Sequence, residues 1–401
     1  MHIALFSPAW PIGRAPNGIV TYVDALRTGL HAQGHRVSIV SPDVGDMPGA
    51  AVHQVALGLA DRLVGAVRAR TGDAIPPVYR YGKAIVATFE RVHARSPIDV
   101  IEMEESFGFV GQVARRTNIA TVVKLHGPAF LTMNERDLRT AWGQKRVQAE
   151  REALASLPVI TSPSRCTLDD TLSAFQLNPA IAAHVVNPVA LPAEAPLWRA
   201  EACTPGLILF VGRFDLTKGG DLMVLAFRRL LVEHPDLRLL FVGPDSGLQQ
   251  ADGSTVHLPE YLASFDDPLL LRQISMRGVL EPPQIQELRA QAAVTVIPSR
   301  RESQGYTALE AMLQGCPVVS TDTSGLGEIV EHEVTGLKAR PDDADDLARA
   351  ISRLLFNREL PTRLGAAARA YVADHHSPAV VVKQTIDVYR RAIGLHQQRG
   401  Q

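Results

Sequence analysis

The fold can be predicted from one stretch, Pro298-Ser299-Arg300-Arg301-Glu302-Ser303-Gln304-Gly305-Tyr306-Thr307-Ala308-Leu309-Glu310. It directly follows an apolar run, residues 292–297, that is typical of a buried strand. The stretch itself predicts a loop and then the first turns of a helix. Open α/β sheets bind their ligands at such junctions, beyond the carboxyl ends of the strands. The segment therefore predicts an α/β sheet and marks the place where a ligand would bind.

The two glutamates of this stretch, Glu302 and Glu310, are candidate acceptors for the hydroxyl groups of a ligand. The loop and helix start offer backbone N–H groups and the positive end of a helix dipole, which favour an anion. If the whole span were helical, the carboxylates would lie roughly 12 Å apart, which suits a diphosphate with a sugar at each end. Taken alone, each glutamate also has a structural interpretation, Glu310 as a solvated helix residue and Glu302 as a capping acid.

The pattern continues beyond Glu310 and resembles the signature of the retaining glycosyltransferases of the GT-B type, in particular family 4. That signature has two glutamates separated by seven residues within a longer string of proline, glycine and apolar residues. The sequence departs from it at Gln304, where the family usually has an aromatic or other apolar residue, and this leaves the donor sugar open. The residues that match the signature in order are Pro298, Ser299, Glu302, Gly305, Leu309, Glu310, Ala311, Met312, Gly315, Pro317, Val318 and Val319.

The resemblance implies an α/β protein with two Rossmann-like doubly wound domains that face each other across a cleft, the GT-B fold. A length of 401 residues independently favours two domains. We expect an acceptor-side domain over residues 1–190, completed by a C-terminal helix at 377–401, and a nucleotide-sugar-binding domain over residues 191–376. A Pro/Ala-rich stretch at 188–205 is predicted to link them.

The first half begins with a predicted strand at 2–7, a Gly/Pro-rich loop at 8–17 and a helix at 18–32. The loop lacks the G-x-G-x-x-G spacing of dinucleotide-binding proteins, which argues against NAD or FAD. In the resembled family this loop carries a glycine pair that faces the donor phosphate, and Asn17-Gly18 takes its place here. The alternative is that Gly18 is a simple turn residue.

A histidine that follows a later strand is a further candidate contact. Residues 120–125 predict a buried strand that ends in His126-Gly127-Pro128, and the carboxyl end of a parallel strand is the ligand side of its sheet. The resemblance implies that His126 contacts the donor sugar, whereas the residues alone also allow a loop histidine satisfied by its Gly-Pro turn. Other strands of this half are predicted at 98–103, which runs into the acidic residues Glu102, Glu104 and Glu105, at 155–162 and at 183–186.

The second half repeats the pattern with a predicted strand at 207–212 and a helix at 221–233. Between them, Arg213 and Lys218 lie five residues apart in a glycine-closed loop, where they can converge on one dianion. The alternative is that both side chains are only solvated. The resemblance favours the first interpretation, because the family has a second signature that Gly212, Arg213, Lys218 and Gly219 match.

The rest of this half contains a long polar segment, 245–273, which we interpret as an insertion relative to the family, either a surface excursion or an acceptor-side or assembly element. No Asp-x-Asp pair occurs in a site context, which is consistent with the metal-independent chemistry that the resemblance implies. Further strands are predicted at 238–242, 276–280 and 317–320, a glycine-rich turn at 325–329, and helices at 345–356 and 378–395.

Composition limits the classes of protein to consider. The formal net charge of −1 gives no basis for nucleic-acid binding. Three cysteines without metal or redox spacing favour a reducing, cytoplasmic location, and no apolar run is long enough for a membrane span. One basic amphipathic segment, 78–95, allows weak peripheral membrane contact, but packing of its apolar stripe beside the strand near Ile98 is the favoured interpretation.

The resemblance implies a metal-independent transferase that uses a UDP-, GDP- or ADP-sugar and no cofactor, with a glycan, a lipid-linked glycan or a small molecule as acceptor. The alternatives are a sugar-nucleotide epimerase or phosphorylase of the same architecture, or a non-catalytic nucleotide-sugar-binding regulator. The implied catalytic residues are Arg213, Lys218, Glu302 and His126. The implied donor-binding residues are Asn17, Gly18, Gly212, Ser303, Gln304, Gly305, Tyr306, Thr307 and Glu310.

Overall fold

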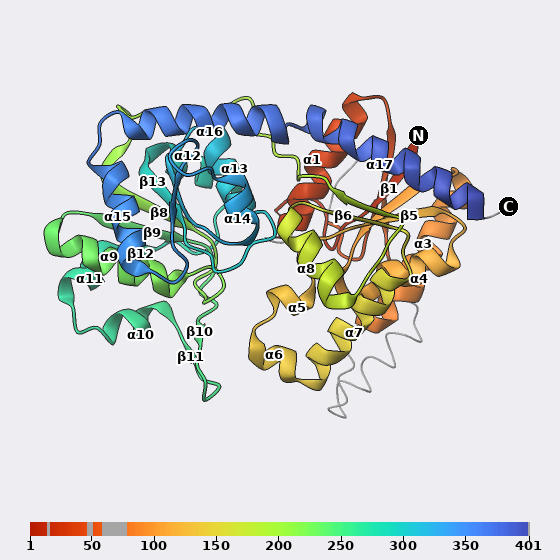
Figure 1. Cartoon of the computed structure of the whole chain (residues 1–401), viewed down its shortest axis with the longest axis horizontal. Coiled ribbons are helices and arrows are strands. Elements are labelled where there is room, and N and C mark those ends of the chain that lie inside the picture. Colours follow the sequence, from red (N-terminus) through yellow and green to blue (C-terminus); the bar gives the residue numbers. More distant parts are fainter. Residues whose placement is uncertain (14–16, 46–50, 58–77, 400–401) are drawn as a thin grey trace. The chain divides into compact units, whose positions relative to one another are not determined.

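A computed structural model describes residues 1–13, 17–45, 51–57 and 78–399 of the chain. The chain forms two compact units, Met1–Pro188 with Pro378–Gln401 and Val189–Ser377. Each unit contains one parallel sheet that carries helices (Figure 1). The predicted class of two Rossmann-like α/β domains is confirmed. Within the loop expected at 8–17, residues 14–16 lie outside the described ranges.

The sheet of the first unit has the order β3-β2-β1-β4-β5-β6-β7, and all its pairs are parallel. Its strands are short and mostly apolar, which is typical of parallel strands buried on both faces. The order reverses between β1 and β4, which makes their carboxyl ends the switch point of this unit. The strands are β1 (His2–Phe6), β2 (Arg36–Ser41), β3 (Val52–Gln54), β4 (Val100–Glu104), β5 (Ala120–Lys124), β6 (Val159–Ser162) and β7 (Ile181–His184).

The last helix of the chain belongs to this first unit. α17 (Pro378–Arg399) packs against α1 (Gly18–Ala32) and contacts β4 and β5 (Figure 1). The two helices approach closely at Gly29, where an added Cβ would lie 2.8 Å from Cγ2 of Val382. The other helices among the described residues of the unit are α3 (Val78–Arg95), η1 (Ser106–Gly108), α4 (Phe109–Arg116), α5 (Ala129–Thr132), α6 (Glu135–Arg139), α7 (Ala141–Ala155) and α8 (Arg165–Phe175).

The apolar stripe of α3 faces the interior of the unit. Ile85, Val86, Phe89 and Val92 are buried in one core with residues of the sheet and of α4. Packing against the sheet, which the sequence allowed as an alternative to membrane contact, is therefore the observed arrangement for these residues. The side chains of residues 78–80, Arg80 among them, lie outside the described part.

The sheet of the second unit is also fully parallel and has the order β12-β9-β8-β13-β14-β15. Its order reverses between β8 and β13, so the switch point of this unit lies at the carboxyl ends of these two strands. Its strands are β8 (Thr204–Val211), β9 (Arg238–Val242), β12 (Ile274–Met276), β13 (Ala292–Ile297), β14 (Val318–Thr321) and β15 (Leu337–Ala339).

Helices cover both faces of this second sheet. Ile208 and Phe210 of β8 are buried with the apolar residues of α9 and α15, whereas Leu209 packs with residues of α12. This alternation follows from the two-residue period of a strand. The helices of the unit are α9 (Gly220–Glu233), α10 (Leu258–Ala263), α11 (Pro268–Gln273), α12 (Pro282–Gln291), α13 (Tyr306–Leu313), α14 (Ser324–Ile329), α15 (Ala344–Leu355) and α16 (Leu360–His376).

The stretch expected to be a linker, 188–205, is packed onto the second unit. The Trp198 indole Nε1 donates to the carbonyl of Ala292 at 2.8 Å, and the Trp198 backbone N–H donates to the carbonyl of Gln314 at 2.9 Å. The stretch also ends earlier than expected, because β8 begins at Thr204.

The polar segment 245–273 is an ordered part of the second unit, so the expectation of a surface excursion is wrong. It forms the hairpin of β10 (Leu248–Gln249) and β11 (Thr255–Val256), followed by α10 and α11. Four of its six leucines are buried in the core beside α9. The sequence analysis missed them because polar residues, glycines and prolines separate the four positions, although Leu270 stands in the short run Leu269–Leu271. These residues are Leu248, Leu258, Leu262 and Leu270.

Three other predictions need correction. The strand expected at 276–280 is β12, Ile274–Met276, since Ile274 pairs with Leu239 and the chain turns at Gly278. The strand expected from residue 155 begins at Val159, because Ala155 is the last residue of α7. The glycine-rich turn expected at 325–329 is the helix α14.

The contact between α1 and α17 predicts an effect of a single methyl group. Gly29→Ala should lower the free energy of unfolding by about 1–3 kcal/mol, because its Cβ would overlap Val382 and Pro378. Gly394→Ala is the matched control, since a Cβ there meets no atom within 4 Å and alanine favours a helix by up to about 1 kcal/mol. Urea unfolding of both variants measures the difference, and equal stabilities would contradict the packing described here.

Candidate active site

The predicted site of the second unit lies at its switch point, where the loops after β8 and β13 meet. Backbone contacts join them: the N–H of Arg300 donates to the carbonyl of Thr217 at 2.8 Å. Gly219 has a φ of +71°, and a Cβ there would overlap the carbonyl oxygen of Pro298. A glycine is therefore required where the two loops cross.

The close contact between the two loops brings Lys218 of the loop after β8 to Glu302 of the loop after β13. The Lys218 Nζ lies 2.5 Å from Oε1 of Glu302, which also accepts the hydroxyl of Ser299 at 3.1 Å. The Lys218 and Glu302 side chains are 25% and 13% exposed, so a ligand can still reach them. Oε2 of Glu302 accepts no hydrogen bond from any residue that the structure describes, and it remains available as an acceptor.

Arg213 lies in the same loop and forms a different contact. Its Nε donates to Asp215 Oδ2 at 2.6 Å, and its side chain is half exposed. Asp215 Oδ1 in turn accepts the backbone N–H of Lys218 at 2.7 Å, which fixes the loop that carries both cations. The backbone of Gly243 packs against Gly212, which directly precedes Arg213: a Cβ added at Gly243 would overlap the carbonyl oxygen of Gly212.

Arg300 is a structural residue of this site that the sequence analysis missed. Its Nη1 and Nη2 donate to the two carboxylate oxygens of Asp221 at 2.7 and 2.8 Å, and Nη1 also reaches the carbonyl of Leu216. Its Nε donates to Asp342 at 2.6 Å. Hydrogen bonding to Asp221 raises the pKa of Arg300. The guanidinium therefore ties the loop after β13 to the start of α9.

Glu310 lies on α13, and Glu302 lies in the loop before it. The span between them is not one helix, so the separation expected for a continuous helix does not apply. Oε2 of Glu310 accepts Nη2 of the buried Arg289 at 2.5 Å, and Glu310 is 30% exposed. Oε1 of Glu310 accepts nothing from the described residues. Each signature glutamate thus has one oxygen anchored by a cation and one that is not.

The residues between the two glutamates form the turn into α13. Gly305 caps the helix in the left-handed region, with a φ of +86°. Gln304 is buried. The burial of Tyr306 itself, and then the charge of the Glu310 carboxylate, raise the pKa of Tyr306 well above its usual value. A Cβ on Gly325 of α14 would overlap the carbonyl of Ser303, so α14 packs directly against the turn. Thr307 lies in the first turn of α13 and is partly buried.

In the first unit, His126 follows β5, as predicted, beside a buried polar cluster. Its ring packs edge-on against Tyr22 of α1, with ring centroids 4.7 Å apart. The Tyr22 hydroxyl donates to Glu102 Oε1 at 2.7 Å, and the buried Lys124 lies over the Tyr22 ring. Burial and then the Lys124 charge lower the pKa of His126 to about 3. Its imidazole is therefore neutral at physiological pH and can act as a hydrogen-bonding group but not as a cation.

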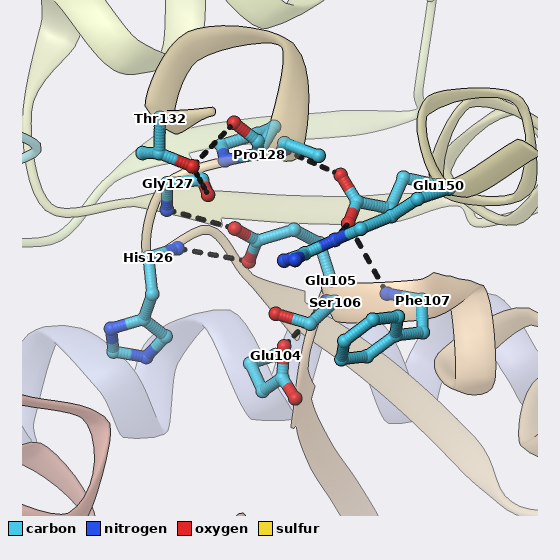
Figure 2. Close-up of polar contacts among 11 residues, drawn as sticks. Glu104, Glu105, Ser106, Phe107, His126, Gly127, Pro128, Thr132 and Glu150 are labelled. Atoms are coloured by element: carbon cyan, nitrogen blue, oxygen red, sulfur yellow. Dashed lines mark hydrogen bonds and ion pairs between the residues drawn. The ribbon is translucent and has the colours of Figure 1, made fainter. Parts of the chain in front are cut away.

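Buried carboxylates hold the backbone of the His126 loop. Glu105 accepts the N–H groups of His126 and Gly127 at 2.9 and 2.8 Å, and Glu150 of α7 accepts the N–H of Ala129 at 2.7 Å. Pro128 has no N–H, so every backbone N–H of residues 126–129 is hydrogen-bonded to one of these two side chains. Figure 2 shows the His126 side chain directed away from the Glu105 carboxylate. The acidic run was visible in the sequence, but Glu150 lies too far along the chain to be connected with it.

Asn17 and Gly18 lie at the start of α1. The Asn17 side chain accepts the backbone N–H of Ile19 at 2.9 Å and caps the helix, and Gly18 is its first residue. This gives Asn17 a structural role, whether or not it contacts a ligand.

Among the described residues, no group of three or more His, Cys, Asp or Glu side chains is arranged to hold a metal ion. No helix in the described ranges is long and apolar enough to span a bilayer.

Each of the two units matches a known family model. Residues 200–371 match the family model described as "Glycosyl transferases group 1", and residues 16–191 match "Glycosyltransferase Family 4". The chain belongs to the group 1, family 4 glycosyltransferases. The resemblance first suggested by the two glutamates and by the Arg213 loop is thus confirmed at the level of family.

Similar proteins agree with this family. This glycosyltransferase is 29% identical to a D-inositol 3-phosphate glycosyltransferase of Nocardioides sp. over 75% of its own length and 70% of the relative's. Sucrose-phosphate synthase from Thermosynechococcus elongatus is similar in structure, with a TM-score of 0.71 and 22% identity over 98% and 99% of the two chains. HepE of Anabaena, solved with UDP-glucose, has a TM-score of 0.69 and 14% identity over 98% and 100%. The last two establish the GT-B fold alone.

The buried carboxylates of this glycosyltransferase predict a pH-dependent stability. Burial, with Glu104 and Glu150 nearby, raises the pKa of Glu105 from 4.5 to about 8. Between these values the folded protein holds a proton that the unfolded chain releases, so the free energy of unfolding falls as pH rises. Glu105→Gln should remove this contribution, and its stability should fall less steeply than that of the wild type from pH 5 to pH 8.

Urea unfolding at several pH values tests this prediction, with Glu90→Gln on the exposed side of α3 as the control. At pH 5 the Glu105→Gln variant should be less stable by about 1–3 kcal/mol, because an amide cannot accept both backbone N–H groups. Wild-type and variant curves that run parallel across the pH range would show that Glu105 does not titrate as described.

Proposed function

We propose that this glycosyltransferase moves a sugar from a UDP-, GDP- or ADP-sugar to an acceptor hydroxyl, with retention of anomeric configuration and without a metal ion. The observation that supports it most strongly is the contact between Lys218 and Glu302 at the switch point of the second unit, with Arg213 in the same loop. Cations and a carboxylate at this position match a ligand that has both phosphate and hydroxyl groups.

The two cations are assigned to the diphosphate. When the bond to the anomeric carbon breaks, negative charge develops on the β-phosphate oxygen. Lys218 has three N–H donors and Glu302 uses one, so others remain for phosphate. Charges that are already in place stabilise the transition state more than the ground state, since they need no reorganisation. Arg213 and Lys218 would supply the positive charge that a metal ion supplies in other enzymes.

The sugar and the ribose are assigned to the carboxylates and to His126. Glu302 would accept sugar hydroxyls through its available Oε2, and the neutral His126 would add a further hydrogen bond. Glu310 would accept the ribose hydroxyls through Oε1. Gly18 and the turn at residues 303–307 would allow close approach of backbone to the donor.

Retention follows from the family resemblance. The acceptor hydroxyl would attack from the face that the leaving phosphate occupies, and this phosphate would take the proton. Such a reaction needs no protein nucleophile.

The acceptor and the location are further parts of the proposal. A relative is named a D-inositol 3-phosphate glycosyltransferase, so small phosphorylated polyols belong in an acceptor panel beside glycans and lipid-linked glycans. The cysteines Cys166, Cys203 and Cys316 are free thiols, which supports a cytoplasmic location. The buried stripe of α3 argues against peripheral membrane contact through that helix.

Labelled nucleotide sugars test the activity directly. Incubation with UDP-, GDP- and ADP-sugars should give transfer, or slow hydrolysis of one donor, and the anomeric proton coupling of the product should show retained configuration. The rate should persist in EDTA. Epimerised donor would indicate an epimerase, binding without turnover would indicate a regulator, and an inverted product would contradict retention.

Lys218→Ala should lower kcat by about 100-fold or more, since a charge at the developing phosphate is lost. The fold should tolerate the change, because Lys218 is partly exposed. Lys383→Ala, on the exposed side of α17, is the control. Circular dichroism and thermal unfolding verify folding, and near-normal turnover of Lys218→Ala would refute the assigned role.

A further inference from the structure

Arg289 on α12 is a buried arginine that contacts Glu310, the second signature glutamate. The residue is 2% exposed, and its Nη2 donates to Oε2 of Glu310 at 2.5 Å. Its Nε is buried without a hydrogen-bond partner among the described residues. Within the described part of the chain, Glu310 is therefore the carboxylate that balances this charge.

Stability alone does not explain this pair. Removing two charges from water costs free energy that offsets their attraction, and apolar pairs of similar volume are often as stable or more so. A buried arginine with one anionic partner and an unsatisfied Nε has a higher desolvation cost than an apolar side chain of similar volume at this position. What the pair does provide is a fixed orientation of the Glu310 carboxylate.

The helix that carries Arg289 is a rigid support for α13. The Gln314 side chain donates to the carbonyl of Gln286 at 2.9 Å, and the Cys316 thiol donates to the carbonyl of Arg289 at 3.4 Å. Gln314 caps the carboxyl end of α13 and lies one turn after Glu310, so both side chains are on the same face and both reach α12. Glu310 is thus held from a helix and not from a loop.

We propose that Arg289 is a positioning residue for nucleotide binding. It holds Glu310 by Oε2 and leaves Oε1 to accept hydrogen bonds from the ribose hydroxyls. The inference rests on the proposed function, in which Glu310 binds the ribose. It parallels the first signature glutamate, where Lys218 and Ser299 hold Oε1 of Glu302 and leave Oε2 available.

The two partners differ in what their loss would do. Without Arg289, Glu310 remains partly exposed and can be solvated, so the protein should fold, but the carboxylate would sample several rotamers. Without Glu310, the buried guanidinium would have no counter-charge, which strongly destabilises a protein. A substitution of Glu310 alone therefore mixes an effect on folding with an effect on binding.

Isothermal titration calorimetry with UDP, GDP and ADP identifies the nucleotide that binds, and its 2′,3′-dideoxy analogue then isolates the ribose contact. The wild type should bind the ribonucleotide about 10- to 100-fold more tightly than the analogue, the range expected for a charged hydrogen bond. Arg289→Met should lose most of this preference and keep its affinity for the analogue. Arg289→Lys should recover part of it, and the exposed control Arg272→Met should behave as the wild type.

A double variant separates positioning from stability. Glu310→Met should lower Tm and abolish the preference for the ribonucleotide. Arg289→Met/Glu310→Met should regain Tm, because both charges are removed together, and should still show no preference. Recovery of the preference in the double variant would overturn the inference, since Glu310 would then serve only to balance Arg289.

The outcomes also separate this inference from the proposed function. A wild type that binds a nucleotide, together with an Arg289→Met variant of unchanged preference, would overturn the role of Arg289 and leave the proposed function intact. A wild type that binds no nucleoside diphosphate would contradict the proposed function itself, and the inference would fall with it.

Discussion

The site of this glycosyltransferase depends on the crossing of two loops at the carboxyl ends of β8 and β13. Gly219 meets the carbonyl of Pro298 so closely that no side chain fits between them. This backbone contact sets Lys218 of one loop against Glu302 of the other. The parallel strand order makes the contact possible, because it brings residues 84 positions apart in sequence to one edge of the sheet. A displacement of either loop would separate the cation from the carboxylate.

Both units fix polar groups by the same physical means, a buried or partly buried ionisable side chain that hydrogen-bonds to a neighbouring element. In the second unit, cations from other elements anchor one oxygen of each signature glutamate. In the first unit the roles are reversed, since the carboxyl groups of Glu105 and Glu150 anchor the backbone of the His126 loop. Such contacts bring little stability for their cost in desolvation, but they fix orientation. Fixed orientation is what stabilisation of a transition state requires.

The sequence was sufficient where a local pattern determines the structure. The strand Ala292–Ile297 and the helix Gly18–Ala32 were predicted with the observed bounds, because an apolar run or an amphipathic period ends at glycine or proline. The supporting residues could not be found in this way. Arg289, Arg300 and Glu150 contact partners on other elements, and only the strand order shows which elements are neighbours. The buried leucines of the segment 245–273 were missed because polar residues, glycines and prolines divide the segment into stretches too short to predict a helix or a strand.

The central claim is that the crossing loops of the second unit bind the diphosphate of a nucleotide sugar. A crystal structure of this protein with a bound nucleoside diphosphate tests it most directly. The account predicts phosphate oxygens within hydrogen-bond distance of Lys218 Nζ and the Arg213 guanidinium. A nucleotide bound elsewhere, with the contact between Lys218 and Glu302 unchanged and both cations in solvent, would contradict it.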